Sequence, residues 1–267
     1  MKTAKILLFC ITCLLIGVCN ISCNDDDYAD ITLSYPDESI IFDNDKRSLS
    51  ISPFGSEITL VIKGGDGEYL LDNSNSEVIS VSRDGNNFTI KPLTLGSSGI
   101  YIKDNSANSY VLSVEVAYYK TIYQVFANKA LIEGEALTED EKEKLEKEIL
   151  GAIPVKPEGK YVFIHNTAEY NVGSVEIYKP DTTKPIEGEF QAEEVEDGET
   201  YWYQYIIKAG KAEYVYKLKD YSFPELRESP PREYWMFEED VTDTYKKRYS
   251  ALEKAYAIQG IEWQRSQ

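Results

Sequence analysis

The sequence predicts a mainly β chain in which an antiparallel β-sandwich precedes an α+β domain, with a helix packed on an antiparallel meander sheet or partial barrel. Three observations support this fold class. Apolar and polar residues alternate with period two through residues 48–117, which is the pattern of half-buried strands. A segment at 139–150 has the composition and the start signal of a helix, and about five strand-like runs follow it between 161 and 218.

Composition divides the chain into four segments. Residues 1–22 are predicted to be a lipoprotein signal peptide, residues 23–47 an acidic tether, residues 48–117 the sandwich and residues 118–267 the α+β domain. An exported chain of about 240 residues is long enough for one or two domains.

The first segment begins with a short basic stretch, Lys2 and Lys5, and continues with an apolar run at 6–18 in which only Thr12 is polar. A secretory signal has an apolar run of roughly 7 to 15 residues, whereas a membrane-spanning helix needs roughly 17 to 25. The length of this run therefore favours export over anchoring by a helix.

The signal ends with a small residue, Ser22, directly before Cys23, and three aspartates follow shortly afterwards. This arrangement resembles the lipobox of Gram-negative bacterial lipoproteins, although Asn20 and Ile21 stand where a leucine and a second small residue are usual. The resemblance implies that Cys23 becomes the new N-terminus and carries acyl chains such as palmitate.

Cys19 is an alternative acceptor for the lipid. It follows Val18, which is a poor residue before a cut, so Cys23 is favoured. Ordinary cleavage and a retained anchor are further alternatives. All four cysteines lie within the first 23 residues, so the exported chain has no disulfide framework and depends on its core for stability.

The resemblance implies attachment to the outer membrane through a lipidated Cys23, and two or more acyl chains would hold the protein there stably. The aspartates at 25–27 resemble the acidic sorting tag of lipoproteins that reach the cell surface, and a solvated leader is the other interpretation. Periplasmic and surface-facing orientations are both open, with the surface slightly favoured.

The exported part is strongly acidic. The chain has 28 basic and 46 acidic residues, and residues 1–22 hold two of the basic ones and none of the acidic ones. From Cys23 onward, 26 basic and 46 acidic residues give a net charge of −20. This charge repels nucleic-acid phosphates and anionic membrane surfaces. We therefore expect no nucleic-acid partner, and membrane attachment through the N-terminal lipid.

The predicted sandwich consists of alternating runs separated by turn-forming clusters of glycine, aspartate and asparagine. The tether contains one apolar patch, at 40–42, and is expected to add one edge strand. The alternating runs themselves lie at 58–63, 79–82, 88–91, 100–102 and 112–116.

Residues 74–102 combine a Ser-Asn turn before a strand, an Asp-Gly turn, a second strand and a glycine turn at 95–99. This order resembles bacterial Ig-like domains of the Big family. The resemblance covers about residues 48–117 and departs from the family at Ser98 and Gly99, where a β-branched residue often follows the glycine turn. It implies an Ig-like sandwich that serves as a spacer or presentation module in surface proteins, without catalytic residues.

Residues 118–132 combine helical spacing with a strand-forming composition, and their β-branched and aromatic content favours a strand. The helix at 139–150 has a capping box in Thr138 and Glu141 and is expected to close at a left-handed Gly151. The strands that follow are expected at 161–165, 173–178, 185–191, 200–208 and 212–218.

A further helix is expected near residue 242, capped by Asp240 or Thr242. Residues 254–264 either extend it or form a last strand, and Gly260 favours the strand because it costs a helix about 1 kcal/mol relative to alanine. The C-terminal half resembles no family that we identify. The apolar side of the helix is formed by Tyr245, Tyr249 and Leu252.

Few residues suggest catalysis. His165 is the single histidine and cannot by itself build a zinc site or a histidine relay. The glycines and serines at 96–99 are one residue too short for a nucleophile elbow. The acids at 43–45 and 72–73 lack the remainder of a calcium loop and are interpreted as solvated turns. We expect no catalytic residue, cofactor or metal; paired carboxylates keep a hydrolase as an alternative.

One group of aromatic residues stands out. Tyr201, Tyr203 and Tyr205 fall on one face of a predicted strand, and Tyr214 and Tyr216 lie on its expected hairpin partner. Cross-strand aromatic pairs that stabilise the sheet are one interpretation. An exposed platform for a sugar face or a partner protein is the other. Such a platform would be extended by Trp235, Arg227 and Arg232.

Together these features predict a lipid-anchored cell-envelope protein that is not an enzyme and that presents a binding domain to glycan or protein ligands. The second hypothesis is a structural accessory subunit of an envelope assembly that docks through the same tyrosine-bearing sheet. The third is a hydrolase that depends on carboxylates alone.

Overall fold

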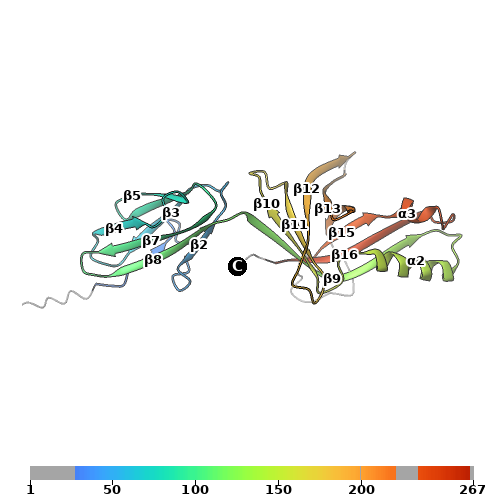
Figure 1. Ribbon diagram of the computed structural model, residues 1–267, viewed down its shortest axis with the longest axis horizontal. Coiled ribbons are helices and arrows are strands. Elements are labelled where there is room, and N and C mark those ends of the chain that lie inside the picture. Colours follow the sequence, from blue (N-terminus) through green and yellow to red (C-terminus); the bar gives the residue numbers. More distant parts are fainter. Residues whose placement is uncertain (1–27, 199, 221–233, 265–267) are drawn as a thin grey trace, which may run out of the picture. The chain divides into compact units, whose positions relative to one another are not determined.

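The computed structural model describes residues 28–198, 200–220 and 234–264. In this part the chain is mainly β, as predicted, and it divides into two compact units (Figure 1). The first unit contains most residues up to 114. The second contains the residues from 115 onward together with two short segments at 50–56 and 92–97.

The predicted lipidation site, Cys23, lies outside the described residues, as do Arg227 and Arg232. Of the helices in the described part, none has the length and apolar character needed to cross a membrane.

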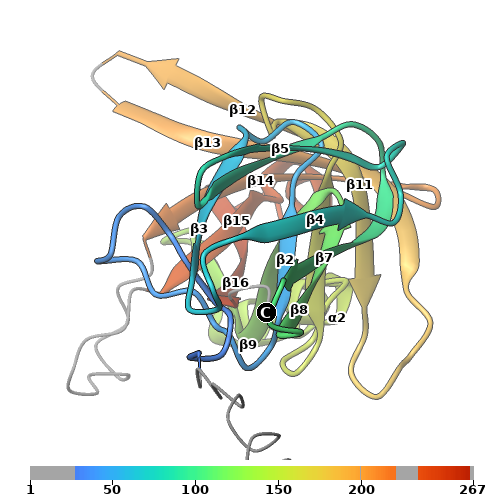
Figure 2. The same cartoon turned by 90° about the vertical axis from the view of Figure 1, so that its left-hand side faces the viewer.

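The first unit has two four-stranded sheets with the strand orders β1-β3-β6-β5 and β2-β8-β7-β4 (Figures 1 and 2). Burial follows the predicted period of two, and every second residue of β8 is buried. Leu60, Phe88, Ile100 and Leu112 are fully buried members of its core. The strands are β1 (Thr32–Ser34), β2 (Ser48–Ile51), β3 (Ile58–Lys63), β4 (Tyr69–Asn73), β5 (Ile79–Asp84), β6 (Asn87–Pro92), β7 (Gly96–Asp104) and β8 (Ser109–Val116).

The tether adds one edge strand, as predicted, and this strand is not at the apolar patch. β1 lies at 32–34 at the edge of its sheet, whereas Ile41 in the patch 40–42 is 89% exposed. The side chain of Asn44 explains the difference, because its Oδ1 accepts a hydrogen bond from Leu33 N and its Nδ2 donates one to Leu33 O, both at 2.8 Å. The side-chain amide of Asn44 thus takes the hydrogen bonds that a neighbouring strand would make to Leu33, and residues 40–42 belong to the loop that positions Asn44.

β4 was not predicted from the sequence, and β7 begins at 96–99, where a turn was predicted. Ser98 is buried, and its hydroxyl donates a hydrogen bond to Asn73 Oδ1 at 2.6 Å. The small residues at this position therefore allow close packing of β7 against the end of β4.

The second unit is a closed barrel in which each of eight strands pairs with the next along the chain and β16 pairs back with β9. All eight pairs are antiparallel. The barrel is complete rather than partial because the two ambiguous segments, 118–132 and 254–264, form long strands that pair with each other. The strands are β9 (Tyr119–Glu133), β10 (Lys160–His165), β11 (Val172–Tyr178), β12 (Ile186–Asp197), β13 (Thr200–Ala209), β14 (Ala212–Asp220), β15 (Trp235–Asp240) and β16 (Lys254–Gln264).

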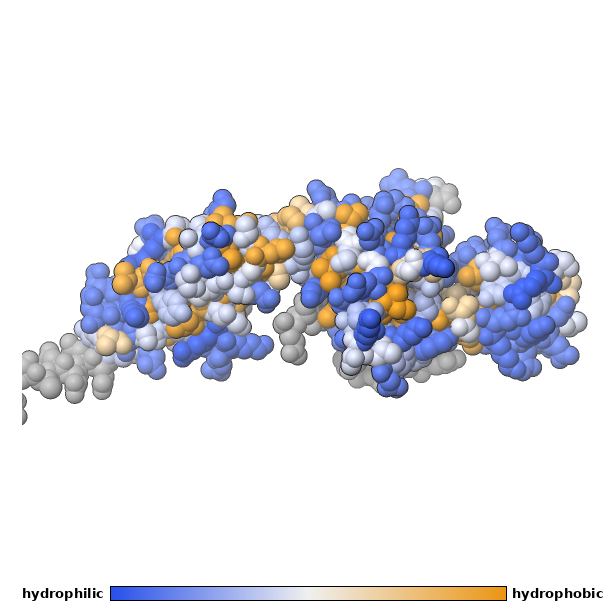
Figure 3. All heavy atoms as spheres, in the orientation of Figure 1, coloured by the Kyte–Doolittle hydropathy of each residue, from blue (hydrophilic) through white to orange (hydrophobic). Residues whose placement is uncertain are grey.

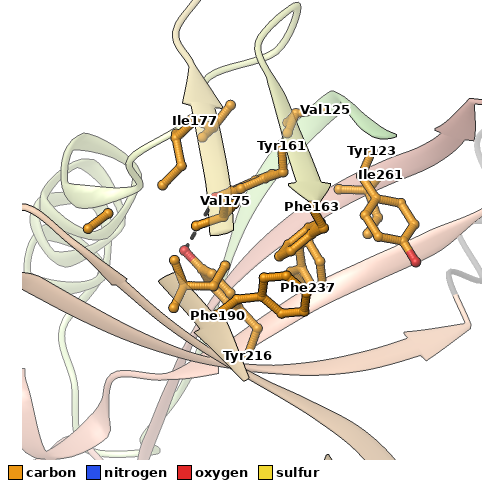
Figure 4. Packing of buried hydrophobic residues seen from close by; sticks show 13 residues of the cluster. Tyr123, Val125, Tyr161, Phe163, Val175, Ile177, Phe190, Tyr216, Phe237 and Ile261 are labelled. Carbon is orange, nitrogen blue, oxygen red and sulfur yellow. Dashed lines mark hydrogen bonds between the residues drawn. The ribbon is translucent and has the colours of Figure 1, made fainter. Parts of the chain in front are cut away.

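Aromatic side chains fill the barrel interior (Figure 4). The hydroxyl of Tyr161 donates to Gln259 Oε1 at 2.8 Å and lies 3.4 Å from the hydroxyl of Tyr216. Gln259 Nε2 donates in turn to Val155 O at 2.9 Å, so the buried polar groups satisfy one another. An eight-stranded barrel is just wide enough for side chains to fill it, and this one has a packed core.

Two helices cover the part of β9 and β16 that extends beyond the barrel core (Figure 1). α2 (Glu139–Ala152) begins with the predicted capping box between Thr138 and Glu141 and buries Leu145 and Ile149. The left-handed cap predicted at Gly151 is wrong. The helix continues through that residue and ends at Ile153, whose backbone N–H bonds to Ile149 O.

α3 (Thr242–Lys246) is shorter than the predicted helix, although Tyr245, Tyr249 and Leu252 are all buried against α2, β9 and β16. Asp240 and Thr242, the two residues predicted as alternative caps of this helix, both form hydrogen bonds at its start. Asp240 Oδ1 accepts a hydrogen bond from Thr242 N, and the hydroxyl of Thr242 accepts one from Ala255 N, each at 2.9 Å. The space-filling view shows a mainly hydrophilic surface over the end of the barrel unit that carries α2 (Figure 3).

Candidate functional site

β12 and β13 continue beyond the barrel wall as a two-stranded ribbon (Figures 1 and 2). β11 pairs with β12 only as far as Gln191, and β14 pairs with β13 only as far as Tyr203. Further out, the two strands pair with each other up to Asp197 and Thr200. We call residues 192–197 and 200–203 the bare ribbon.

The five predicted tyrosines lie on one face of β13 and β14, and this face runs from the barrel interior onto the bare ribbon. Tyr205 pairs across the strands with Tyr216, and Ile207 pairs with Tyr214. Tyr216 is 1% exposed, whereas Tyr203 is 52% and Tyr201 68% exposed. The structure therefore brings all five together on one face but exposes only the outer two.

The inner tyrosines belong to the barrel core. The Tyr205 ring lies 5.1 Å from that of Phe163 and 5.5 Å from that of Phe237, and the rings of Tyr214 and Tyr216 are stacked 5.9 Å apart. Desolvation by burial raises the pKa values of Tyr205 and Tyr216, so both hydroxyls stay protonated. For these three residues the structural interpretation, aromatic pairs within the sheet, accounts for the pattern.

On the bare ribbon each exposed tyrosine faces a glutamate across the strands. Glu194 is directly opposite Tyr203, and Glu196 is directly opposite Tyr201. Directly opposed residues have Cβ atoms about 4.5–5.5 Å apart. Both glutamates are exposed, and within the described residues neither forms an ion pair. We call Glu194, Glu196, Tyr201 and Tyr203 the tyrosine face.

The opposite side of the ribbon is already occupied by its own contacts. Lys217 Nζ lies 4.1 Å from the centre of the Trp202 ring, in a cation–π arrangement. Gln204 Nε2 donates a hydrogen bond to Glu193 Oε1 at 3.0 Å. The two sides therefore differ, because the lysine is held on the Trp202 side and the tyrosine face keeps two carboxylates without a cation.

A groove of about 410 Å³ lies on the outer barrel wall across β11, β12 and β13. Gly173 forms part of its floor, and a Cβ there would lie 1.9 Å from Ile164 O, so no other residue fits. Its walls carry groups that hydrogen-bond sugars readily, among them Ser174, Gln191 and Lys208. This groove is the second candidate surface.

His165 is buried in the barrel wall and is a structural residue. Its Nε2 lies 2.8 Å from Thr121 Oγ1 and its Nδ1 lies 2.7 Å from Tyr170 O. Burial lowers its pKa below the ordinary value, which favours the neutral ring.

Another groove of the barrel, of about 230 Å³, is lined by Lys217 and by acids that include Glu213, Glu238 and Asp240. Glu213 is paired with Lys208 at 3.5 Å. Glu238 and Glu239 are neighbours on β15, so their side chains point to opposite faces of the sheet. Glu238 is paired with Lys219 at 2.5 Å, whereas desolvation raises the pKa of Glu239 to about 7. Among the described residues, no three or more His, Cys, Asp or Glu side chains are grouped so that they could hold a metal ion.

Comparison with known proteins adds only weak likeness. No family model matches the chain, and no curated protein matches it. Among solved structures it is similar to domains 5 and 6 of the S-layer protein SbsC, with 11% identity over 87% of this chain and 96% of that one. The TM-score of 0.26 is too low for this likeness to support an argument about fold or function.

Sequence reasoning found the tyrosines but missed Glu194 and Glu196. A signal for them is present in the sequence, because the pairing of Asp197 with Thr200 fixes the register of the two strands. Counting back from that pair places Glu196 opposite Tyr201 and Glu194 opposite Tyr203.

Proposed function

We propose that this chain is a lipid-anchored cell-envelope protein that is not an enzyme and whose barrel presents the bare ribbon to a protein partner. The observation that carries the proposal is the exposure of Tyr201 and Tyr203 on a ribbon that leaves the barrel wall. Exposed tyrosines are typical of binding surfaces because a rigid ring and a hydroxyl combine apolar contact with a hydrogen bond.

The barrel core supports a surface site rather than an interior one. Tyr161, Phe163, Tyr205 and Phe237 occupy the space that a ligand would need inside the described barrel. A partner is therefore expected on the outside, where the bare ribbon provides both side chains and backbone. If the partner is bound permanently, the chain is an accessory subunit of an envelope assembly.

Photocrosslinking in the cells that naturally produce the protein tests this proposal. Benzoylphenylalanine is introduced at Tyr201 or Tyr203, with the exposed Tyr101 of the first unit as the matched control position. We expect one protein adduct from both ribbon positions and none from position 101. Equal adducts at all three positions, or none from the ribbon, would contradict the proposal.

The anchor is tested separately. Mass spectrometry of the mature N-terminal peptide is expected to show an acylated Cys23 with palmitate-sized chains. A Cys23→Ala variant is expected to leave the membrane fraction. An unmodified peptide that begins at another residue would overturn the anchor while leaving the ribbon proposal intact.

Glycan capture is the second candidate function, and the outer groove favours it. The groove combines a glycine floor with amide, hydroxyl and amine groups. A glycan array with the full chain and a variant that combines Gln191→Ala with Lys208→Ala, both exposed residues of the groove, checks this function. Sugar binding that is lost in a folded variant supports the groove, and absence of sugar binding removes it.

A further inference from the structure

We infer that the tyrosine face binds an extended segment of a partner protein that carries arginine or lysine at alternate positions. This inference rests on the proposed function, because it names the chemistry of the partner that the bare ribbon takes. Three features support it, namely the alternation of rings and carboxylates, the free edge of β12 and the charge of the chain.

The tyrosine face offers two identical subsites for a cation. In each one an exposed ring stands directly opposite an exposed carboxylate, as in the pairs Tyr201 with Glu196 and Tyr203 with Glu194. A guanidinium group can stack on the ring and hydrogen-bond to the carboxylate at the same time. A neutral ligand would leave both carboxylates without a partner.

The spacing of the subsites matches a β-strand. Glu194 and Glu196 are two residues apart on β12, which corresponds to about 7 Å along a strand. Side chains at alternate positions of an added strand have the same spacing and point to the same side. A partner with basic residues at positions i and i+2 therefore fills both subsites at once.

The backbone beside these subsites is free to accept such a strand. Among the described residues, 193–197 of β12 pair on one side only, with β13. An edge with unpaired N–H and C=O groups is the template for strand addition, in which backbone hydrogen bonds give affinity and alternate side chains give specificity.

The negative charge of the chain favours a basic partner segment over a second copy of the chain at this edge. The exported chain has a net charge of −20, and a second bare ribbon would bring another Glu194 and Glu196 to the interface. Like charges in close contact disfavour that association. A basic segment relieves the repulsion instead.

The test measures binding of two synthetic peptides to the full chain in non-ionic detergent by isothermal titration calorimetry. Both are acetylated octapeptides of threonine and valine with two arginines. In the first the arginines are at positions three and five, and in the second at positions three and four, so that only the first peptide presents both guanidinium groups on one side. We expect the first to bind at least ten times more tightly, with an affinity that falls as salt is raised.

Two variants locate the binding. Glu194→Gln with Glu196→Gln removes the charges and keeps the shape, and is expected to weaken binding of the first peptide at least tenfold. Glu187→Gln with Glu189→Gln is the matched control, because it makes the same charge change on the other face of β12 and is expected to change Kd less than twofold. Tyr201→Leu with Tyr203→Leu keeps apolar area but removes the rings, and is expected to weaken binding about fivefold or more. Circular dichroism confirms that each variant is folded.

Equal affinities for the two peptides, no binding of either, or an equal loss in the control variant would overturn the inference. The failure of the proposed function is distinguishable from these results. If the peptides do not bind but crosslinking from Tyr201 still gives a protein adduct, the ribbon is a binding surface for a partner of other chemistry. If the peptides bind as expected and no adduct forms, the proposed function fails while the cation subsites stand.

Discussion

Two pairs of strands, β9 with β16 and β12 with β13, extend beyond the core of the barrel as ribbons. They differ in whether helices cover them. The ribbon of β9 and β16 is covered by α2 and α3, which bury Leu145, Ile149 and Tyr245 against it. The ribbon of β12 and β13 has no such cover among the described residues and exposes Tyr201 and Tyr203. An extended strand pair thus forms part of a second hydrophobic core in one place and an open surface in the other.

The composition of the two ribbons explains this difference. The inward face of the covered ribbon carries small residues such as Ala130, Ala255 and Ala257, which let a helix approach closely. The corresponding face of the bare ribbon alternates tyrosine with glutamate, and a helix packed there would bury two unpaired carboxylates at a high cost. The covered ribbon is therefore expected to matter for stability, and the bare ribbon for binding.

The largest expected effect lies where the bare ribbon enters the barrel. Tyr205→Ala removes a ring that contacts Phe163, Phe190 and Phe237 and should lower the free energy of unfolding by about 3–5 kcal/mol. Urea denaturation followed by tryptophan fluorescence measures this change. A loss below about 1 kcal/mol would mean that the tyrosine face is open as far as Tyr205, and that the boundary between core and binding surface is drawn in the wrong place.

The cover of the other ribbon gives the next effect. Leu145 is 0% exposed and packs in the cluster formed by α2, α3 and the β9–β16 ribbon. Leu145→Ala should therefore cost about 2–4 kcal/mol of unfolding free energy. The same change at Leu150, which is only partly buried in that cluster, is the control and should cost about half as much. Equal small losses at both positions would mean that the helices are a loose appendage.

These two ribbons also show what the sequence could and could not predict. The capping box at Thr138, the period-two runs and the strand preference of 254–264 are local signals, and each was correctly interpreted. Closure of the barrel is not local, because it depends on pairing between β9 and β16, which are more than a hundred residues apart. Alternation alone does not distinguish a closed barrel from an open meander.

The exposure of the five tyrosines was unpredictable for a related reason. Period two places Tyr201, Tyr203 and Tyr205 on one face, but the exposed fraction depends on where the neighbouring strands end. β14 stops pairing at Tyr203, and that boundary separates a core tyrosine from two surface ones. In the tether the edge strand itself was predicted, but its position was not, because nothing local shows that Asn44 bonds to Leu33.

A pH-dependent effect is expected at the base of the covered ribbon. Burial raises the pKa of Glu239 from its ordinary value of 4.5 to about 7, so between these pH values the folded protein holds a proton that the unfolded chain has released. Keeping this carboxylate buried and charged lowers the free energy of unfolding. This penalty is absent below pH 4.5, grows as pH rises to about 7 and is complete above that. Because the carboxyl is partly exposed, we expect the penalty to be about 1–2 kcal/mol rather than the full value of the shift.

Glu239→Gln removes this penalty. The variant should equal the original protein at pH 4 and be more stable by about 1–2 kcal/mol at pH 8, as measured by urea denaturation at both values. Glu238→Gln is not a suitable control because it breaks the ion pair with Lys219, and Glu213 is likewise paired with Lys208, so Glu187→Gln at an exposed position of β12 serves instead. A stability difference that is the same at both pH values would show that Glu239 acts through packing and not through its charge.

The smallest expected effect is the most informative for function. Tyr201 is 68% exposed and its main neighbour is Glu196 across the ribbon, so Tyr201→Ala should change the unfolding free energy by less than about 0.5 kcal/mol. The residue differs from Tyr205 only by four positions along the same face of the same strand. If the two substitutions cost the same, the ribbon is part of the core and has no free surface. If they differ as expected, an aromatic ring is held in water at no benefit to the fold, and binding is the role that remains for it.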